Sequence, residues 1–327
     1  MRALANQNFV RPFVWMVAAA ALWATAFLAP VAAKSASPFE IVLARYAAYG
    51  LVSLVGLKGC RLSKFRTRDL AYALAFAAFG NVAFYYFLVI GMRSVSPSLA
   101  IPIVGLLPVT VSLAGNWSEP RLSLRRIALP LALILVGLAA IDMFTPPAGQ
   151  RLGSGTSFLG VAALLSCLAM WTWFAVANSA YLKRRLDVTA TEWASLTGVA
   201  ALLLCAAMLS GYFVANRVAP SLAAARLYLA EGNGAIIVLW GMILGCGASW
   251  GSAVLFNKAV KVLPISIAGQ LVVLETVFGI VYVWLAEVHL PNLGELTGIA
   301  CAIGGIYFSI RALQTSVGKR ENAAIRG

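Results

Sequence analysis

The chain has 327 residues, of which 61% are hydrophobic and only 11% are charged, and its mean hydropathy is +0.88. Soluble domains carry about 25% charged residues, so this composition excludes a surface built for water. A net charge of +14 would by itself indicate an acidic partner such as nucleic acid. Whether that partner is needed depends on where the basic residues lie.

Chemical motifs of enzymes and metal proteins are missing from the sequence. The five cysteines are scattered singly without a CxxC pair, which predicts small apolar side chains rather than a disulfide or zinc framework. His289 is the single histidine, so we expect no metal site, no cofactor and no His-based catalytic triad. An HExxH motif, paired aspartates, a nucleophile with its base and a Walker A motif are also absent, so an enzyme is not expected. A non-catalytic lipid-handling membrane protein is one class that the missing motifs do not exclude.

Long apolar stretches dominate the chain. A helix that crosses the roughly 30 Å hydrocarbon core needs about 20 mostly apolar residues. Stretches of this kind predict ten transmembrane helices, in chain order 13–33, 38–57, 69–90, 97–116, 126–144, 156–178, 190–211, 234–257, 265–285 and 293–312. We expect the first to be retained rather than cleaved as a signal peptide, because it is long and takes part in an internal repeat.

Basic residues divide unequally between the two sides of these ten spans. With the N-terminus inside, 19 of the 25 Lys and Arg residues lie on the inner side, five lie outside, and Arg45 lies within a span. This asymmetry follows the positive-inside rule and would be lost if one helix were added or removed. It explains the net charge without nucleic acid. We therefore expect a multi-pass membrane protein with both termini in the cytoplasm.

The two halves of the sequence correspond. The segment from Gly80 to Pro97 matches the segment from Gly247 to Pro264, with glycine at both starts and proline at both ends. Since the repeat contains five helices, an odd number, its second copy enters the membrane from the opposite side. The sequence therefore predicts an all-α fold of two inverted five-helix repeats, residues 1–150 and 151–327, around a central cavity. This architecture suits alternating access.

These features resemble the drug/metabolite transporter superfamily in its EamA-like branch. The resemblance lies in the five-plus-five inverted repeat, the ALWATAF segment around Trp23, the Ser37-Pro38 start of the second helix with Arg45 after it, and the turns at Pro97 and Pro264. It covers essentially the whole chain. Within this branch the chain is most similar to YddG-type exporters of aromatic and other neutral amino acids. The resemblance implies a permease of the cell inner membrane whose central cavity is lined by helices 1, 3, 4, 6, 8 and 9.

Aromatic and amide side chains deep in the spans are the candidate substrate-binding residues. Aromatic rings stack on a planar substrate or attract its ammonium group at about 0.5–2 kcal/mol per contact, and amides bind an amino-acid zwitterion. The alternative is that the rings only pack between helices and the amides only bond neighbouring helices. The candidates are Trp23, Asn81, Tyr85, Tyr86, Trp171, Asn178, Trp250, Asn257 and Gln270.

Charged and proline residues within the spans are candidates for coupling or gating. Glu275 lies about 15 Å deep, where a carboxylate needs a partner or a proton. It either binds a substrate ammonium, carries a coupling proton or is a protonated structural group. Arg45 either snorkels outward, pairs with Glu40 or gates the outer side, and we do not expect it to bind substrate. Pro102 and Pro108 are expected to kink the fourth helix.

The sequence thus predicts a transporter that exports aromatic and other neutral amino acids or related small metabolites by alternating access. A multidrug or other metabolite permease of the same superfamily is the alternative, since the same aromatic cavity would serve it. The expected partners are a small-molecule amino-acid substrate and the lipid bilayer. A monomer is expected, with a homodimer as the alternative.

Overall fold

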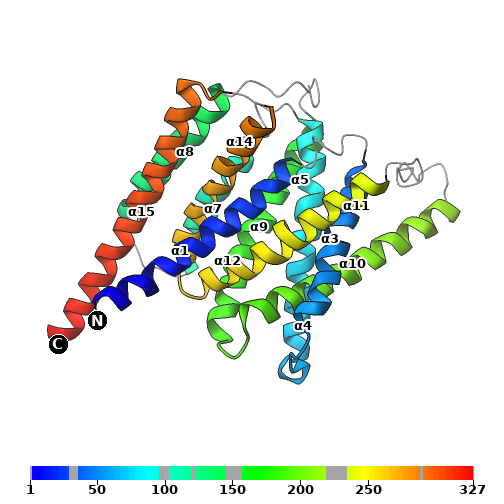
Figure 1. The fold of residues 1–327 in the computed structure, drawn as a ribbon, viewed down its shortest axis with the longest axis horizontal. Coiled ribbons are helices and arrows are strands. Elements are labelled where there is room, and N and C mark those ends of the chain that lie inside the picture. Colours follow the sequence, from blue (N-terminus) through cyan, green and yellow to red (C-terminus); the bar gives the residue numbers. More distant parts are fainter. Residues whose placement is uncertain are drawn as a thin grey trace.

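A computed structural model describes residues 2–28, 36–95, 100, 103–118, 123–144, 157–218, 234–287 and 290–326. Within these ranges all regular structure is helical (Figure 1). The helices are α1 Arg2–Ala24, α3 Pro38–Gly56, α4 Thr67–Ala77, α5 Ala83–Ser94, α7 Leu107–Ser118, α8 Leu124–Phe144, α9 Phe158–Arg184, α10 Ala190–Val218, α11 Gly234–Met242, α12 Ser252–Val260, α13 Ile265–Leu271, α14 Val273–Glu287 and α15 Leu293–Arg326.

In the part of the chain that the structure describes, seven helices are long and apolar enough to cross a membrane. Two shorter apolar helices, Val10–Ala24 and Ile103–Ser118, accompany them. Each of the ten predicted spans overlaps a helix, while ten as the number of crossings stays a prediction. The first helix differs most from its predicted span: it begins at Arg2 and ends at Ala24, where a 3₁₀ turn over Thr25–Phe27 follows.

The start of α3 shows how the sequence sets a helix boundary. Ser37 is the N-cap residue, its hydroxyl accepts a hydrogen bond from the Glu40 amide, and the Glu40 carboxylate accepts one from the Ser37 amide at 2.9 Å. Pro38 follows at the first helical position, where its missing N–H is harmless. The Glu40 carboxylate therefore caps the first turn of its own helix.

Two helices contain π-helical segments at corresponding places. Residues Ala78–Val82 form a π-helix between α4 and α5, and Ile243–Gly251 form another between α11 and α12. They contain Gly80 and Gly247, the two glycines that the sequence comparison pairs. π-Helical turns are rare and occur frequently at functional sites, so these two segments direct attention to the helices that contain them.

Two further helices are interrupted. The helical segment before α7 is broken at Leu106, two residues ahead of Pro108, whose ring nitrogen has no hydrogen to donate. Pro102 lies outside the described residues. The predicted span 265–285 is also not continuous, because a turn at Val272 divides it into α13 and α14. Glu275 lies in the first turn after that break.

The helices pack in specific pairs. α8 packs against α15, α7 against α13 and α3 against α10, while α5 packs against α9 and α1 against α12. The first pair approaches closely through glycines: a Cβ atom on Gly137 would lie 2.6 Å from the Gly298 carbonyl oxygen, and one on Gly298 would lie 2.7 Å from that of Gly137. α8 and α15 form one edge of the bundle in Figure 1. The start of α1 and the end of α15 lie at the same end of the bundle as the α3–α4 and α9–α10 connections.

Candidate functional site

An aromatic cluster lies where helices from both halves of the chain meet. The Trp23 ring of α1 lies edge-on to Trp171 of α9 at 5.8 Å between centroids and contacts Phe256 of α12 at 5.4 Å. Trp171 also contacts Phe256 at 6.1 Å and Phe84 of α5 at 6.4 Å. The structure therefore brings two predicted residues, Trp23 and Trp171, together. Phe174, on the same face of α9, lies 6.3 Å from Trp171.

An amide pair adjoins this cluster. Asn178 of α9 donates a hydrogen bond from Nδ2 to Oδ1 of Asn257 in α12 at 2.9 Å, and both side chains are buried. The indole N–H of Trp193 in α10 donates to Asn178 Oδ1 at 2.8 Å. Trp193 in turn stacks on Tyr181, with 4.0 Å between ring centroids. The two predicted asparagines thus meet, but each already has a protein partner.

Arg45 lies inside the bundle, and two expectations for it are wrong. Its Nε donates to the Ser249 hydroxyl at 2.9 Å, one terminal nitrogen lies 3.4 Å from the Ala248 carbonyl oxygen, and 7% of its surface is exposed. It therefore does not snorkel outward. It does not pair with Glu40 either, because that carboxylate closes the capping box of α3. The guanidinium instead lies over the Tyr85 ring at 4.3 Å, a cation–π contact.

Glu275 and Gln270 lie in different surroundings. Glu275 is partly buried and makes no hydrogen bond or ion pair with a described residue, although it lies within electrostatic range of Arg45. Gln270 is fully buried on α13 and accepts a hydrogen bond from Ser309 of α15. Since α15 lies at the edge of the bundle, Gln270 joins two helices there. Its amide nitrogen has no partner among the described residues.

The remaining predicted residues contact partners outside the aromatic cluster. Asn81 donates from its amide to the Phe76 carbonyl at 3.0 Å, a bond that the π-helical turn makes available. Trp250 donates its indole N–H to Ser195 of α10 at 2.9 Å. Tyr86 contacts its neighbour Phe87. These contacts join or shape helices, and a substrate role for the three residues stays a prediction.

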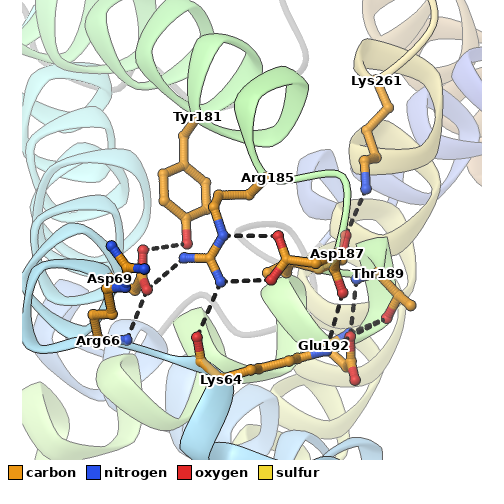
Figure 2. Close-up of polar contacts among 10 residues, drawn as sticks. Lys64, Arg66, Asp69, Tyr181, Arg185, Asp187, Thr189, Glu192 and Lys261 are labelled. Atoms are coloured by element: carbon orange, nitrogen blue, oxygen red, sulfur yellow. Dashed lines mark hydrogen bonds and ion pairs between the residues drawn. The ribbon is translucent and has the colours of Figure 1, made fainter.

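A cluster of charged residues connects the two halves at the end of the bundle that holds the α3–α4 and α9–α10 connections (Figure 2). Arg185, just after α9, binds Asp69 of α4 at 2.5 Å and Asp187 at 2.8 Å, and Tyr181 donates to Asp69 at 2.8 Å. Lys64 pairs with Glu192 at 2.5 Å. We call this set the ionic cluster; its members are Lys64, Asp69, Tyr181, Arg185, Asp187 and Glu192.

The charges of the ionic cluster stabilise one another. The hydrogen bond from Arg185 lowers the pKa of Asp187 to about 2, and bonds to Asp187 and Asp69 raise the pKa of Arg185 above its ordinary 12.5. Nearby, burial lowers the pKa of Lys261, whose ammonium donates to the Val188 carbonyl (Figure 2). Asp187 and Arg185 are therefore in their charged forms at neutral pH.

A separate groove of about 700 Å³ lies between α7 and α9. Its lining is apolar except for Thr110 and Thr172, whose hydroxyls bond each other at 2.8 Å, and Trp173, which is 44% exposed, flanks it. Trp171 does not line it, so the groove is distinct from the aromatic cluster. Long apolar helices with polar and aromatic groups inside the bundle define a multi-pass membrane protein.

Comparisons with known proteins agree with this class. Residues 11–143 match the EamA-like transporter family. The chain is 26% identical over 308 residues to the inner membrane protein YtfF of Escherichia coli (strain K12), covering 91% of this chain and 94% of that protein. Its fold is similar to a crystal structure at a TM-score of 0.71 and 16% identity, across 93% of this chain and 98% of the other. The matched family is one of transporters and the relative is an inner membrane protein, and neither name specifies a substrate.

Sequence reasoning missed Phe84, Phe256 and the ionic cluster. A phenylalanine in an apolar helix carries no signal that separates a cavity position from packing, although Phe256 directly precedes the predicted Asn257. The acidic members of the ionic cluster could have been found, because Asp69, Asp187 and Glu192 lie near helix ends among the many basic residues of the α3–α4 and α9–α10 connections.

Proposed function

We propose that this protein is a transporter that exports aromatic and other neutral amino acids, or related small metabolites, by alternating access between two inverted five-helix halves. The observation that carries the proposal is the aromatic cluster, in which Trp23 and Phe84 of the first half meet Trp171 and Phe256 of the second. Rings from both halves bind a planar side chain between them, and the halves move relative to each other around it.

The pairing of helices supports the inverted repeat. Exchanging the halves maps α3 onto α10, α7 onto α13 and α8 onto α15. In each of these three cases the helix packs against its own counterpart. The same exchange maps the α5–α9 pair onto the α12–α1 pair, which also packs. The π-helical segments and the breaks at Leu106 and Val272 fall in exchanged helices as well.

In this mechanism the ionic cluster closes the inner side. It joins Lys64 and Asp69 of the first half to Glu192 and Arg185 of the second, so the inner side opens only when these bonds break. The amide pair Asn178 and Asn257 lies between the ionic cluster and the aromatic cluster on α9 and α12. On this proposal, the conformation with these bonds formed is the one closed toward the inner side.

Flux into proteoliposomes tests the proposal. Labelled Phe, Trp and Thr should enter vesicles that contain the purified protein faster than empty vesicles, while a cationic dye should not. If no amino acid moves faster than in empty vesicles, the proposal is wrong. The apolar groove beside Trp173 favours the alternative, a permease for hydrophobic compounds that enter from the bilayer, and faster uptake of the dye alone would support it.

A further inference from the structure

Arg45 is a buried cation that forms no ion pair with an acidic residue of the described ranges. Its hydrogen bonds go to a hydroxyl and a carbonyl oxygen, those of Ser249 and Ala248, and its charge lies over the Tyr85 ring. These contacts use Nε and one terminal nitrogen, which leaves the other terminal nitrogen without a hydrogen bond to a described residue. Buried charges in proteins are normally paired, and a charge inside the bilayer costs several kcal/mol.

Two more polar groups in this region have no full hydrogen bond to a described residue. The Tyr85 hydroxyl is buried close to the Arg45 guanidinium, but no hydrogen bond of ordinary length joins it to a described residue. The Glu275 carboxyl group makes no hydrogen bond to a described residue either, and although Arg45 acts on it electrostatically, no hydrogen bond or ion pair joins the two side chains. Glu275 lies at the start of α14, where the helix dipole favours an anion. The Arg45 guanidinium of α3 and the Glu275 carboxyl group of α14 are thus within electrostatic range of each other, and no hydrogen bond or ion pair joins them.

A zwitterion would satisfy all three groups at once. Its carboxylate would accept hydrogen bonds from the Arg45 guanidinium and the Tyr85 hydroxyl, and its ammonium group would bind the Glu275 carboxylate. An ion of one sign would leave either Arg45 or Glu275 uncompensated. We propose that Arg45 and Tyr85 form the carboxylate subsite, and Glu275 the ammonium subsite, of an α-amino-acid binding site.

The aromatic cluster lies beside these subsites. Phe84, which contacts Trp171, directly precedes Tyr85 on α5. Glu275 is also within electrostatic range of Cys167, one helical turn from Trp171 on α9. An amino acid held by its charged groups at Arg45 and Glu275 would therefore direct its side chain toward the rings of Trp23 and Trp171. This inference rests on the proposed function and specifies how its substrate is recognised.

Ligand analogues test the subsites in the unaltered protein. Phenylalanine, phenethylamine, which lacks the carboxylate, and 3-phenylpropionate, which lacks the ammonium group, would compete with labelled phenylalanine for binding to the purified protein. We expect each analogue to bind at least about tenfold more weakly than phenylalanine, since each loses one charge-assisted contact. Equal competition by phenethylamine and phenylalanine would overturn the carboxylate subsite.

Variants assign the residues. Arg45→Gln should weaken phenylalanine binding about tenfold or more and leave phenethylamine binding unchanged, and Glu275→Gln should weaken phenylalanine but not 3-phenylpropionate. Arg217→Gln, which removes an exposed charge near the end of α10, is the matched control and should change neither. If Arg45→Gln weakened all three ligands equally, Arg45 would be structural and the inference wrong.

The two proposals fail in different ways. If the unaltered protein binds phenylalanine and its two analogues alike, transport of an aromatic compound stands and the zwitterion site does not. If neither phenylalanine nor any other amino acid binds or moves, the proposed function fails, and the zwitterion site fails with it.

Discussion

The Arg185 guanidinium and the Asp69 carboxylate bond each other at 2.5 Å although 116 residues separate them in the sequence. Asp69 also accepts a hydrogen bond from the Arg66 amide as α4 begins, so one carboxylate both caps its own helix and holds the other half of the protein. The side chain of Asp69 is 7% exposed and that of Arg185 is 21% exposed, which protects the pair from screening by salt.

Arg185→Gln should destabilise the protein. It removes the charge-assisted bonds to Asp69 and Asp187 and leaves the buried Asp69 carboxylate with weaker partners, which costs about 1–3 kcal/mol. Thermal unfolding in detergent measures the loss. Arg184→Gln is the control, because Arg184 is the exposed neighbour with the same charge. Equal melting temperatures for the two variants would contradict a role for the Arg185–Asp69 bond.

The contribution of Asp187 should depend on pH in the acid range. Its pKa is lowered from 3.8 to about 2 by the bond to Arg185, so the folded state binds its proton less readily than the unfolded state does. This stabilisation is fully present above pH 3.8 and is lost as the pH falls through about 2. Because Asp187 is 56% exposed, salt should reduce the effect.

Melting curves between pH 2 and 5 check this expectation. The melting temperature of Asp187→Asn should fall less steeply with decreasing pH than that of the unaltered protein, because the variant has no carboxyl group to protonate. Parallel curves for both proteins would show that Asp187 contributes no pH-dependent stability.

The amide pair should show energetic coupling. Asn178→Ala leaves the Trp193 indole N–H and Asn257 without their bonds, at about 1–3 kcal/mol for each buried group left unsatisfied. Asn257→Ala removes the other side of the pair. In a double-mutant cycle, the double variant should lose less unfolding free energy than the sum of the losses in the two single variants. The reason is that each single substitution already breaks the bond between the two amides. Strict additivity of the unfolding free energies would contradict the coupling.

The sequence predicted the helices better than their irregularities. Apolar stretches and basic loops mark spans directly, so the helices α3, α9 and α10 begin within a few residues of their predicted starts. The break at Val272 was missed because it contains neither glycine nor proline: the segment 271–274 reads Leu-Val-Val-Leu. Such a break depends on tertiary packing, which hydropathy does not report.

Candidate site residues were recognised by type, and their partners were not. Asn178 and Asn257 were identified as polar groups in apolar helices, but 79 residues separate them, so only the fold reveals that they bond each other. For Arg45 the sequence left three roles open, which were snorkelling outward, pairing with Glu40 and gating the outer side, because an isolated charge in a span is costly. The structure surrounds it with Ser249 and Tyr85, which no single helix pattern could indicate.

Gly298→Ala should destabilise the contact between α8 and α15. The added Cβ atom would lie 2.7 Å from the Gly137 carbonyl oxygen, and because that atom is backbone, the helices must separate. Overpacking of this kind costs about 1–3 kcal/mol. Gly304→Ala is the matched control on the same helix, since no atom lies within 4 Å of its Cβ position. Equal melting temperatures would contradict close packing of this pair.

Trp171→Leu should slow the transport of aromatic substrates more than the transport of non-aromatic ones. The substitution keeps an apolar side chain but removes the ring that contacts Trp23, Phe84 and Phe256, and an aromatic pair contributes about 0.5–1.5 kcal/mol beyond its buried area. Flux of Trp and Phe into proteoliposomes should therefore fall about two- to tenfold relative to flux of Thr.

Trp117→Leu is the control for Trp171→Leu, because Trp117 is 90% exposed at the end of α7. This substitution should leave the fluxes of Trp, Phe and Thr unchanged. A stability defect alone would lower the amount of active Trp171→Leu protein and so reduce every flux by the same factor. The ratio of Phe to Thr flux therefore reports recognition of the aromatic ring rather than folding. An unchanged ratio in Trp171→Leu would remove Trp171 from the substrate site.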